Sequence, residues 1–124
     1  MLLGKQKFDR GRRLISAQDF SHVFDEPVRS ADQFFTLLAK LNKSDKPRLG
    51  LAISKKNTRR AVDRNKIKRL ARESFRLNQS SLCNIDVVVM AKRNAASQPN
   101  DILFDCLNNH WKNLRHKFSK MNAS

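Results

Sequence analysis

Residues 58–77 read TRRAVDRNKIKRLARESFRL and contain neither glycine nor proline, which predicts one uninterrupted helix. At about 100° per residue, four apolar or small side chains gather on one arc of the helix: Ile67, Leu70, Ala71 and Ser74. Phe75 and Leu77 lie at the edges of this arc. The opposite arc is polar and basic: Asn65, Lys68, Arg69, Arg72 and Arg76. One face of this helix is therefore expected to pack on a sheet, and the other to meet a partner.

The positive charge of the chain is concentrated around this helix. The 124 residues carry a net charge of +15, and residues 55–76 alone hold ten basic against two acidic residues, a net +8. Four cations follow one another at four-residue spacing: Arg64, Lys68, Arg72 and Arg76. Each such like-charge pair destabilises an isolated helix by about 0.2–0.5 kcal/mol, so the pattern indicates a polyanion-binding face. Arginine dominates it, and the planar guanidinium suits phosphates and bases, which favours nucleic acid over a membrane surface.

The flanking segments predict a single α+β domain over residues 1–124, with elements in the order α-β-β-α-β-α. Residues 33–41 and 48–54 are expected as strands, and the polar residues 42–47 between them as a hairpin loop that pairs them antiparallel. Residues 85–91 form the clearest strand. The remaining expectations are a basic arm over about 1–13, a helix over 17–25 capped by Ser16, a short extra strand over 28–31, a last helix from about 100, and a frayed tail over about 119–124.

No catalytic or metal-binding grouping is present in the sequence, and none is expected in this chain. The three histidines are scattered, and His110 and His116 are expected on the solvated face of the last helix. Cys83 and Cys106 lack the spacing of a metal site, so both are expected as small core side chains with no disulfide-linked partner. The cysteine count and the lack of a signal peptide or a spanning apolar run favour a cytoplasmic protein. An autonomous nuclease is disfavoured.

Two phenylalanines on the first helix, Phe20 and Phe24, lie four residues apart. Such a pair is ordinary core in most helices. Beside a basic surface, exposed aromatic rings also hold single-stranded nucleic acid, each stacked base contributing about 1–3 kcal/mol. The spacing leaves both interpretations open.

Residues 54–76 closely resemble the signature of the bacterial ribonuclease P protein component. The resemblance rests on Lys55-Lys56, Arg60-Ala61-Val62, Arg64-Asn65 with Lys68-Arg69, and Arg72-Glu73. Supporting similarities lie in residues 13–24, 47–51 and 86–92, so the resemblance runs from about Arg13 to Trp111.

The resemblance implies a protein that assists an RNA catalyst. In this family the RNA subunit, with bound Mg²⁺, removes the 5′ leader from precursor tRNA, and the protein binds that RNA and the leader. No cofactor is expected on the protein itself. The resemblance also implies an α/β sandwich with a left-handed βαβ crossover, a hand that only about 2% of such units have.

Site residues follow from the matching positions. The resemblance implies contacts with the RNA subunit from six motif residues: Arg60, Arg64, Asn65, Lys68, Arg69 and Arg72. Asn65 could instead support a hydrated metal ion nearby. The leader is expected at Phe20, Phe24, Lys55 and Lys56. Some family members carry a stacking tyrosine on the first long strand, where this chain, which has no tyrosine, is expected to have Leu37.

Two other classes of protein share some of these features. A structural RNA-binding protein of the ribosomal type would have the same size, charge and basic helix without a role in processing. A DNA-binding regulator would need a helix just before the basic helix, where residues 49–54 predict a strand.

Overall fold

The structure, a computed structural model, describes residues 17–123. The predicted cap at Ser16 and the basic arm lie outside the described residues. Along the chain the elements are α2 (Ala17–Phe24), β1 (Val28–Ala31), β2 (Phe35–Leu41), β3 (Arg48–Ala52), α3 (Ala61–Asn78), a 3₁₀ turn η2 (Gln79–Ser81), β4 (Ile85–Ala91) and α4 (Asn100–Ala123). The predicted α+β order is confirmed, with β1 as the extra strand. α4 continues as helix through residues that were expected to fray.

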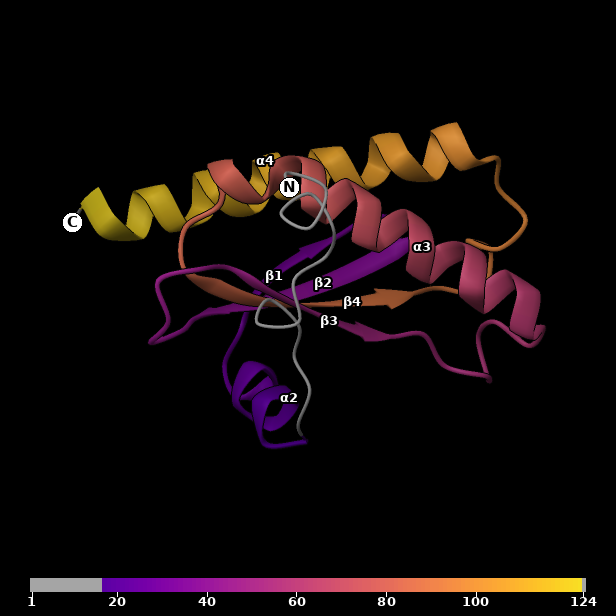
Figure 1. Ribbon diagram of the computed structural model, residues 1–124, viewed down its shortest axis with the longest axis horizontal. Helices are drawn as coiled ribbons and strands as arrows, with labels where there is room; N and C mark the ends of the chain where they lie inside the picture. Colours follow the sequence, from indigo (N-terminus) through magenta and orange to yellow (C-terminus); the bar gives the residue numbers. More distant parts are fainter. Residues whose placement is uncertain (1–16, 124) are drawn as a thin grey trace, which may run out of the picture.

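The four strands form one mixed sheet in the order β1-β2-β4-β3. Two of its three pairings, β1 with β2 and β2 with β4, are antiparallel, and β3 pairs with β4 in parallel. Helices α3 and α4 cover one face of the sheet, and α2 lies on the other face (Figure 1). The expected sandwich with a mostly antiparallel sheet is thus present.

The predicted hairpin between β2 and β3 is wrong. These two strands do run in opposite directions, but β4 lies between them and pairs with both. Six of the seven residues of β4 are buried, and its valines face both layers of the molecule. Such a strand is most stable at the centre of a sheet, where both faces are covered and both edges hydrogen-bonded.

The connection from β3 through α3 to β4 joins two adjacent parallel strands, as the resemblance implies. Its left hand stays a prediction from the resemblance. The main core lies between the sheet and the two long helices, where Phe35, Leu37, Phe75 and Trp111 are fully buried. A second, small cluster, centred on Val23 of α2 and Val88 of β4, holds α2 against the other face.

His110 was expected at the surface, and this expectation is wrong, because only 4% of the residue is exposed. Its Nδ1 atom lies 2.6 Å from the hydroxyl of Ser30 in β1, which also accepts a hydrogen bond from Asn113. Its Nε2 atom lies 2.9 Å from the carboxylate of Asp32, at ion-pair distance but not aligned as a hydrogen bond. The imidazole therefore joins α4 to β1 and to the turn that follows it. His116 is exposed as expected.

Burial lowers the pKa of His110, an effect that the nearby Asp32 opposes only in part. The unfolded chain therefore binds a proton at this residue more readily than the folded chain does. We expect the free energy of unfolding to decrease as the pH falls below about 6.5, the ordinary pKa of histidine. His110→Gln should be less stable at pH 7 by about 1–3 kcal/mol and should lose less on acidification to pH 5, measured by urea unfolding at each pH.

Asp32 does not interfere with this measurement. Burial raises the pKa of Asp32, but hydrogen bonds from the backbone N–H groups of Phe35 and Phe34, together with smaller effects of His110 and Cys106, leave the pKa below its usual value. Its contribution to stability is lost only as the pH falls below about 3.8. An equal loss in the parent and in His110→Gln between pH 7 and pH 5 would contradict the assignment to His110.

Candidate nucleic-acid interface

Helix α3 separates an apolar face from a basic one, as the periodicity predicts. Ile67, Ala71, Ser74 and Phe75 are buried against the sheet and α4, and Leu70 packs at their margin. Leu77 departs from the prediction and is 55% exposed. The six motif residues of the resemblance are at least partly accessible: Arg60, Asn65 and Arg69 are exposed, and Arg64, Lys68 and Arg72 are half-buried.

The two acidic residues of α3 each pair with an arginine. Arg60 approaches Asp63 at 3.8 Å, and Arg76 donates two hydrogen bonds to Glu73, at 2.6 and 3.1 Å. These bonds from Arg76 lower the pKa of Glu73. Asp63 and Glu73 are the only acids of the helix, so the stretch between them stays strongly positive. A face of this kind binds phosphates by electrostatic attraction and counterion release.

The first helix presents its aromatic pair partly to solvent. Val23 is the buried anchor of α2, Phe20 is half-buried at its side, and Phe24 is 46% exposed. The two rings lie 6.3 Å apart, tilted by 35°. Neither ring belongs to the main core, but Phe20 packs against the second cluster. Phe24 is therefore not an ordinary core residue, whereas the position of Phe20 agrees with both interpretations.

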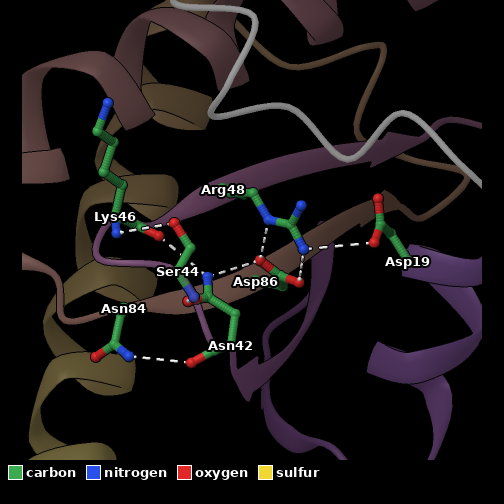
Figure 2. A network of polar contacts seen from close by, with 7 residues as sticks. All are labelled: Asp19, Asn42, Ser44, Lys46, Arg48, Asn84 and Asp86. Atoms are coloured by element: carbon green, nitrogen blue, oxygen red, sulfur yellow. Dashed lines mark hydrogen bonds and ion pairs between the residues drawn. The ribbon is translucent and has the colours of Figure 1, made fainter.

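A partly buried ion pair connects α2 to the sheet (Figure 2). The guanidinium of Arg48 donates two hydrogen bonds to Asp86, at 2.8 and 2.7 Å, and lies 3.4 Å from Asp19 of α2. Asp86 also accepts a hydrogen bond from Asn42 at 2.8 Å. The hydrogen bonds to Asp86 raise the pKa of Arg48, which therefore stays charged. Arg48 thus connects β4, through Asp86, to α2, the helix that carries Phe20 and Phe24.

This ion pair is not among the expectations from the sequence, although one signal for it is present there. Asp86 interrupts an otherwise apolar strand and is only 1% exposed, and a buried carboxylate needs a partner. The partner depends on strand order. Arg48 faces Asp86 in the β3–β4 register, a pairing that the predicted hairpin would not produce.

Lys55 and Lys56 are exposed in the loop that follows β3. Helix α2 approaches both ends of β3, because Asp19 lies 3.4 Å from Arg48, and Ala52 packs against the same small cluster as Phe20. The two lysines thus come three and four residues after a residue of the cluster that holds α2.

The structure also corrects the position given to Leu37. Its side chain is fully buried under the long helices, on the face away from α2. Leu38 is the residue of β2 that packs beside Val23 and Val88. Adjacent residues of a strand point to opposite faces, so Leu37 offers no stacking contact on the α2 side of the sheet.

Neither a metal cluster nor a membrane helix is found in the described part of the chain. Within residues 17–123 no three His, Cys, Asp or Glu side chains gather closely enough to hold a metal ion. None of the helices described is long and apolar enough to cross a bilayer. Both cysteines are free thiols, half-buried beside the core as expected.

Comparisons with known proteins agree with this geometry. A family model described as Ribonuclease P matches residues 8–115. The ribonuclease P protein component of Methylococcus capsulatus is 49% identical over 112 residues, which cover 90% of this chain and 88% of that protein. The corresponding protein of Pseudoalteromonas translucida is 46% identical over 110 residues, 89% of this chain and 79% of that one.

Solved structures of the same kind share the fold. The Staphylococcus aureus RNase P protein superposes with a TM-score of 0.76 at 31% identity, covering 82% of this chain and 93% of that one. The RNase P protein from Thermotoga maritima gives 0.73 at 29% identity, covering 82% and 96%. These similarities do not favour a ribosomal-type protein without a role in processing. The chain therefore belongs to the ribonuclease P protein component family: it is a protein subunit of the endoribonuclease ribonucleoprotein ribonuclease P and partners the RNA of that enzyme.

Proposed function

We propose that this subunit uses two separate surfaces, one for the catalytic RNA and one for the 5′ leader of precursor tRNA. The basic face of α3 and the loop before it bind the RNA subunit. The α2 side of the sheet holds the single-stranded leader, and the RNA subunit with its Mg²⁺ cleaves it. The observation that carries the proposal is the separation on α3 of a buried apolar face from a strongly positive one.

The RNA-subunit surface comprises the six motif residues: Arg60, Arg64, Asn65, Lys68, Arg69 and Arg72. The guanidinium and ammonium groups of the five basic residues suit the phosphates of the RNA backbone. Contacts with phosphates fix the position and orientation of the protein on the RNA but do not read the base sequence. The protein supplies no acid, base or metal ligand to the cleavage. The free thiols fit the reducing cytoplasm, the compartment that we propose.

The leader surface comprises the aromatic pair of α2 and the loop after β3. Phe20 packs against the same cluster as Ala52, the last residue of β3, and the exposed Lys55 and Lys56 follow three and four residues later. Base stacking on the rings and charge attraction by the lysines would together hold single-stranded RNA without reading its sequence.

Reconstitution tests the proposed function directly. The purified chain is combined with a bacterial ribonuclease P RNA and precursor tRNA at low Mg²⁺, and cleavage at the mature 5′ end is followed by gel. Correct cleavage is expected only when RNA and protein are both present. Cleavage by the protein alone, or no stimulation of the RNA, would overturn the proposal.

Phe20→Ala should weaken binding of the leader selectively. Loss of one stacked base corresponds to about 1–3 kcal/mol, or roughly 5- to 150-fold in Kd for precursor tRNA. Binding of mature tRNA, which lacks the leader, should stay unchanged, measured with the reconstituted enzyme. Phe104→Ala is the matched control, because Phe104 is also half-buried but lies on α4, across the sheet from α2. Equal losses for precursor and mature tRNA would indicate damage to the core instead.

A further inference from the structure

The loop before α3, residues 53–60, carries four exposed cations: Lys55, Lys56, Arg59 and Arg60. It is anchored at its first half. The N–H of Asn57 donates to the hydroxyl of Ser54, and the N–H of Thr58 to the carbonyl of Ser54, at 3.1 and 2.9 Å. The Asn57 amide also donates to the carbonyl of Ala91 at the end of β4, at 3.2 Å. Thr58 is 2% exposed, so the chain is held firmly up to this residue.

The second half of the loop lacks the usual support at a helix N-terminus. Arg60 occupies the N-cap position of α3, and its side chain makes no capping hydrogen bond. Serine, threonine, aspartate and asparagine are the residues that normally stabilise this position, by about 1 kcal/mol relative to alanine. The side chain of Arg60 approaches Asp63 at 3.8 Å, and the backbone that carries Arg59 and Arg60 has a further contact from within α3.

Arg64 makes that contact. Its Nη1 atom donates hydrogen bonds to the carbonyls of Thr58 and Arg59, at 3.0 and 2.8 Å. Side chains of a helix lean toward its N-terminus, so a residue of the first turns reaches back to the entering chain. Both bonds come from this one nitrogen, whose two hydrogens serve two adjacent carbonyls.

We propose that Arg64 is a positioning residue, which braces the entry into α3 so that Arg59 and Arg60 face the RNA subunit. This inference rests on the proposed binding of the RNA subunit by α3, and it separates one motif residue from the others by its role. Arg69, one helical turn and a half further along, is exposed and serves as the reference for a residue that contacts RNA directly.

A thermodynamic cycle tests the proposal. Kd for ribonuclease P RNA is measured over a range of salt concentrations for Arg64→Ala, for Arg59→Ala/Arg60→Ala, and for the triple variant. Arg64→Ala alone should weaken binding about tenfold or more, and lower the log–log salt slope by more than the roughly 0.9 of one phosphate contact. In the Arg59→Ala/Arg60→Ala background the same change should cost less than about twofold, because the groups that Arg64 positions are already gone.

Arg69→Ala supplies the matched background. There, Arg64→Ala should keep its full effect, because Arg69 does not depend on the brace. An equal effect of Arg64→Ala in all backgrounds would show a direct contact and overturn the proposal. No effect of Arg64→Ala, with weakened binding by Arg69→Ala, would overturn the proposal and leave the proposed function standing. No effect of either would overturn both.

Arg64→Lys replaces Arg64→Ala in these measurements if Arg64→Ala unfolds. It keeps the charge, but its ammonium group ends one bond short of the Nη1 position, so binding should be at least about threefold weaker than in the parent; parent-like binding would indicate a simple charge contact. Amide hydrogen exchange in free Arg64→Lys should increase at residues 59–61 while residues 67–75 stay protected. Unchanged exchange at residues 59–61 would overturn the brace.

Discussion

Asp86→Ala should lower the free energy of unfolding by about 3–5 kcal/mol, because it leaves the half-buried guanidinium of Arg48 without its main partner. For a domain with a total stability of about 5–15 kcal/mol, this is a large fraction. The corresponding decrease in Tm is on the order of 10–20 °C. Urea and thermal unfolding followed by circular dichroism measure both quantities.

Two variants control this experiment. Asp45→Ala removes an exposed aspartate from the loop between β2 and β3, and should change stability by no more than about 0.5 kcal/mol. Arg48→Met/Asp86→Val replaces the whole ion pair by apolar side chains and should recover most of the loss. A loss below about 1 kcal/mol for Asp86→Ala would show that the ion pair is not a main determinant of stability.

The Arg69→Ala/Arg72→Ala double variant should bind ribonuclease P RNA with a shallower salt dependence. Each lost phosphate contact lowers the log–log slope by about 0.9 on a duplex and about 0.7 on a single strand, so two contacts lower it by about 1.4–1.8. Near 0.1 M salt this corresponds to a loss of affinity on the order of 25- to 60-fold. Filter binding or fluorescence anisotropy over a salt series gives both values.

A variant with the same change in net charge separates position from total charge. Lys112 and Lys120 are exposed on α4, outside the basic helix, and Lys112→Ala/Lys120→Ala also removes two positive charges. Its slope should match that of the parent. If both double variants changed the slope equally, binding would follow the net charge of the protein and not the face of α3.

The two proposed RNA surfaces depend on different supports within one small domain. α3 is held by the main core, through Ile67, Ala71 and Phe75. α2 is held by a small cluster around Val23 and by the contact of Asp19 with Arg48. The leader surface is therefore expected to be lost before the RNA-subunit surface when the protein is destabilised, since few buried contacts hold α2 in place.

Local sequence patterns predicted the elements and the basic face well. The strand at Ile85–Ala91 has the bounds expected for it, and the helices at Ala17–Phe24 and Ala61–Asn78 differ from their predicted ranges by one to three residues. These features depend on residues within a few positions of one another, through turn formation, apolar periodicity and the absence of glycine and proline. The quoted motif was equally local, and it predicted the family.

Errors arose where distant segments meet. The predicted hairpin failed because β4, which follows more than thirty residues after β3, inserts between β2 and β3. The polar neighbours of His110 along the helix favour a solvated side chain, but its hydrogen-bond partner in the fold, Ser30, lies eighty positions earlier. Leu37 and Leu38 are both apolar, and only the pairing of β2 with β4 decides which of them faces the main core.

The sequence by itself determined the elements, the basic face of α3 and, through the motif around it, the family. Only the tertiary structure decided the strand order, the Arg48–Asp86 ion pair and the burial of His110. It also decided the hydrogen bonds from Arg64 to the loop before α3. The physical reason is the range of the interactions. Helix and strand preferences depend on near neighbours, whereas a buried charge or imidazole is stable only beside a partner that folding brings from elsewhere in the chain.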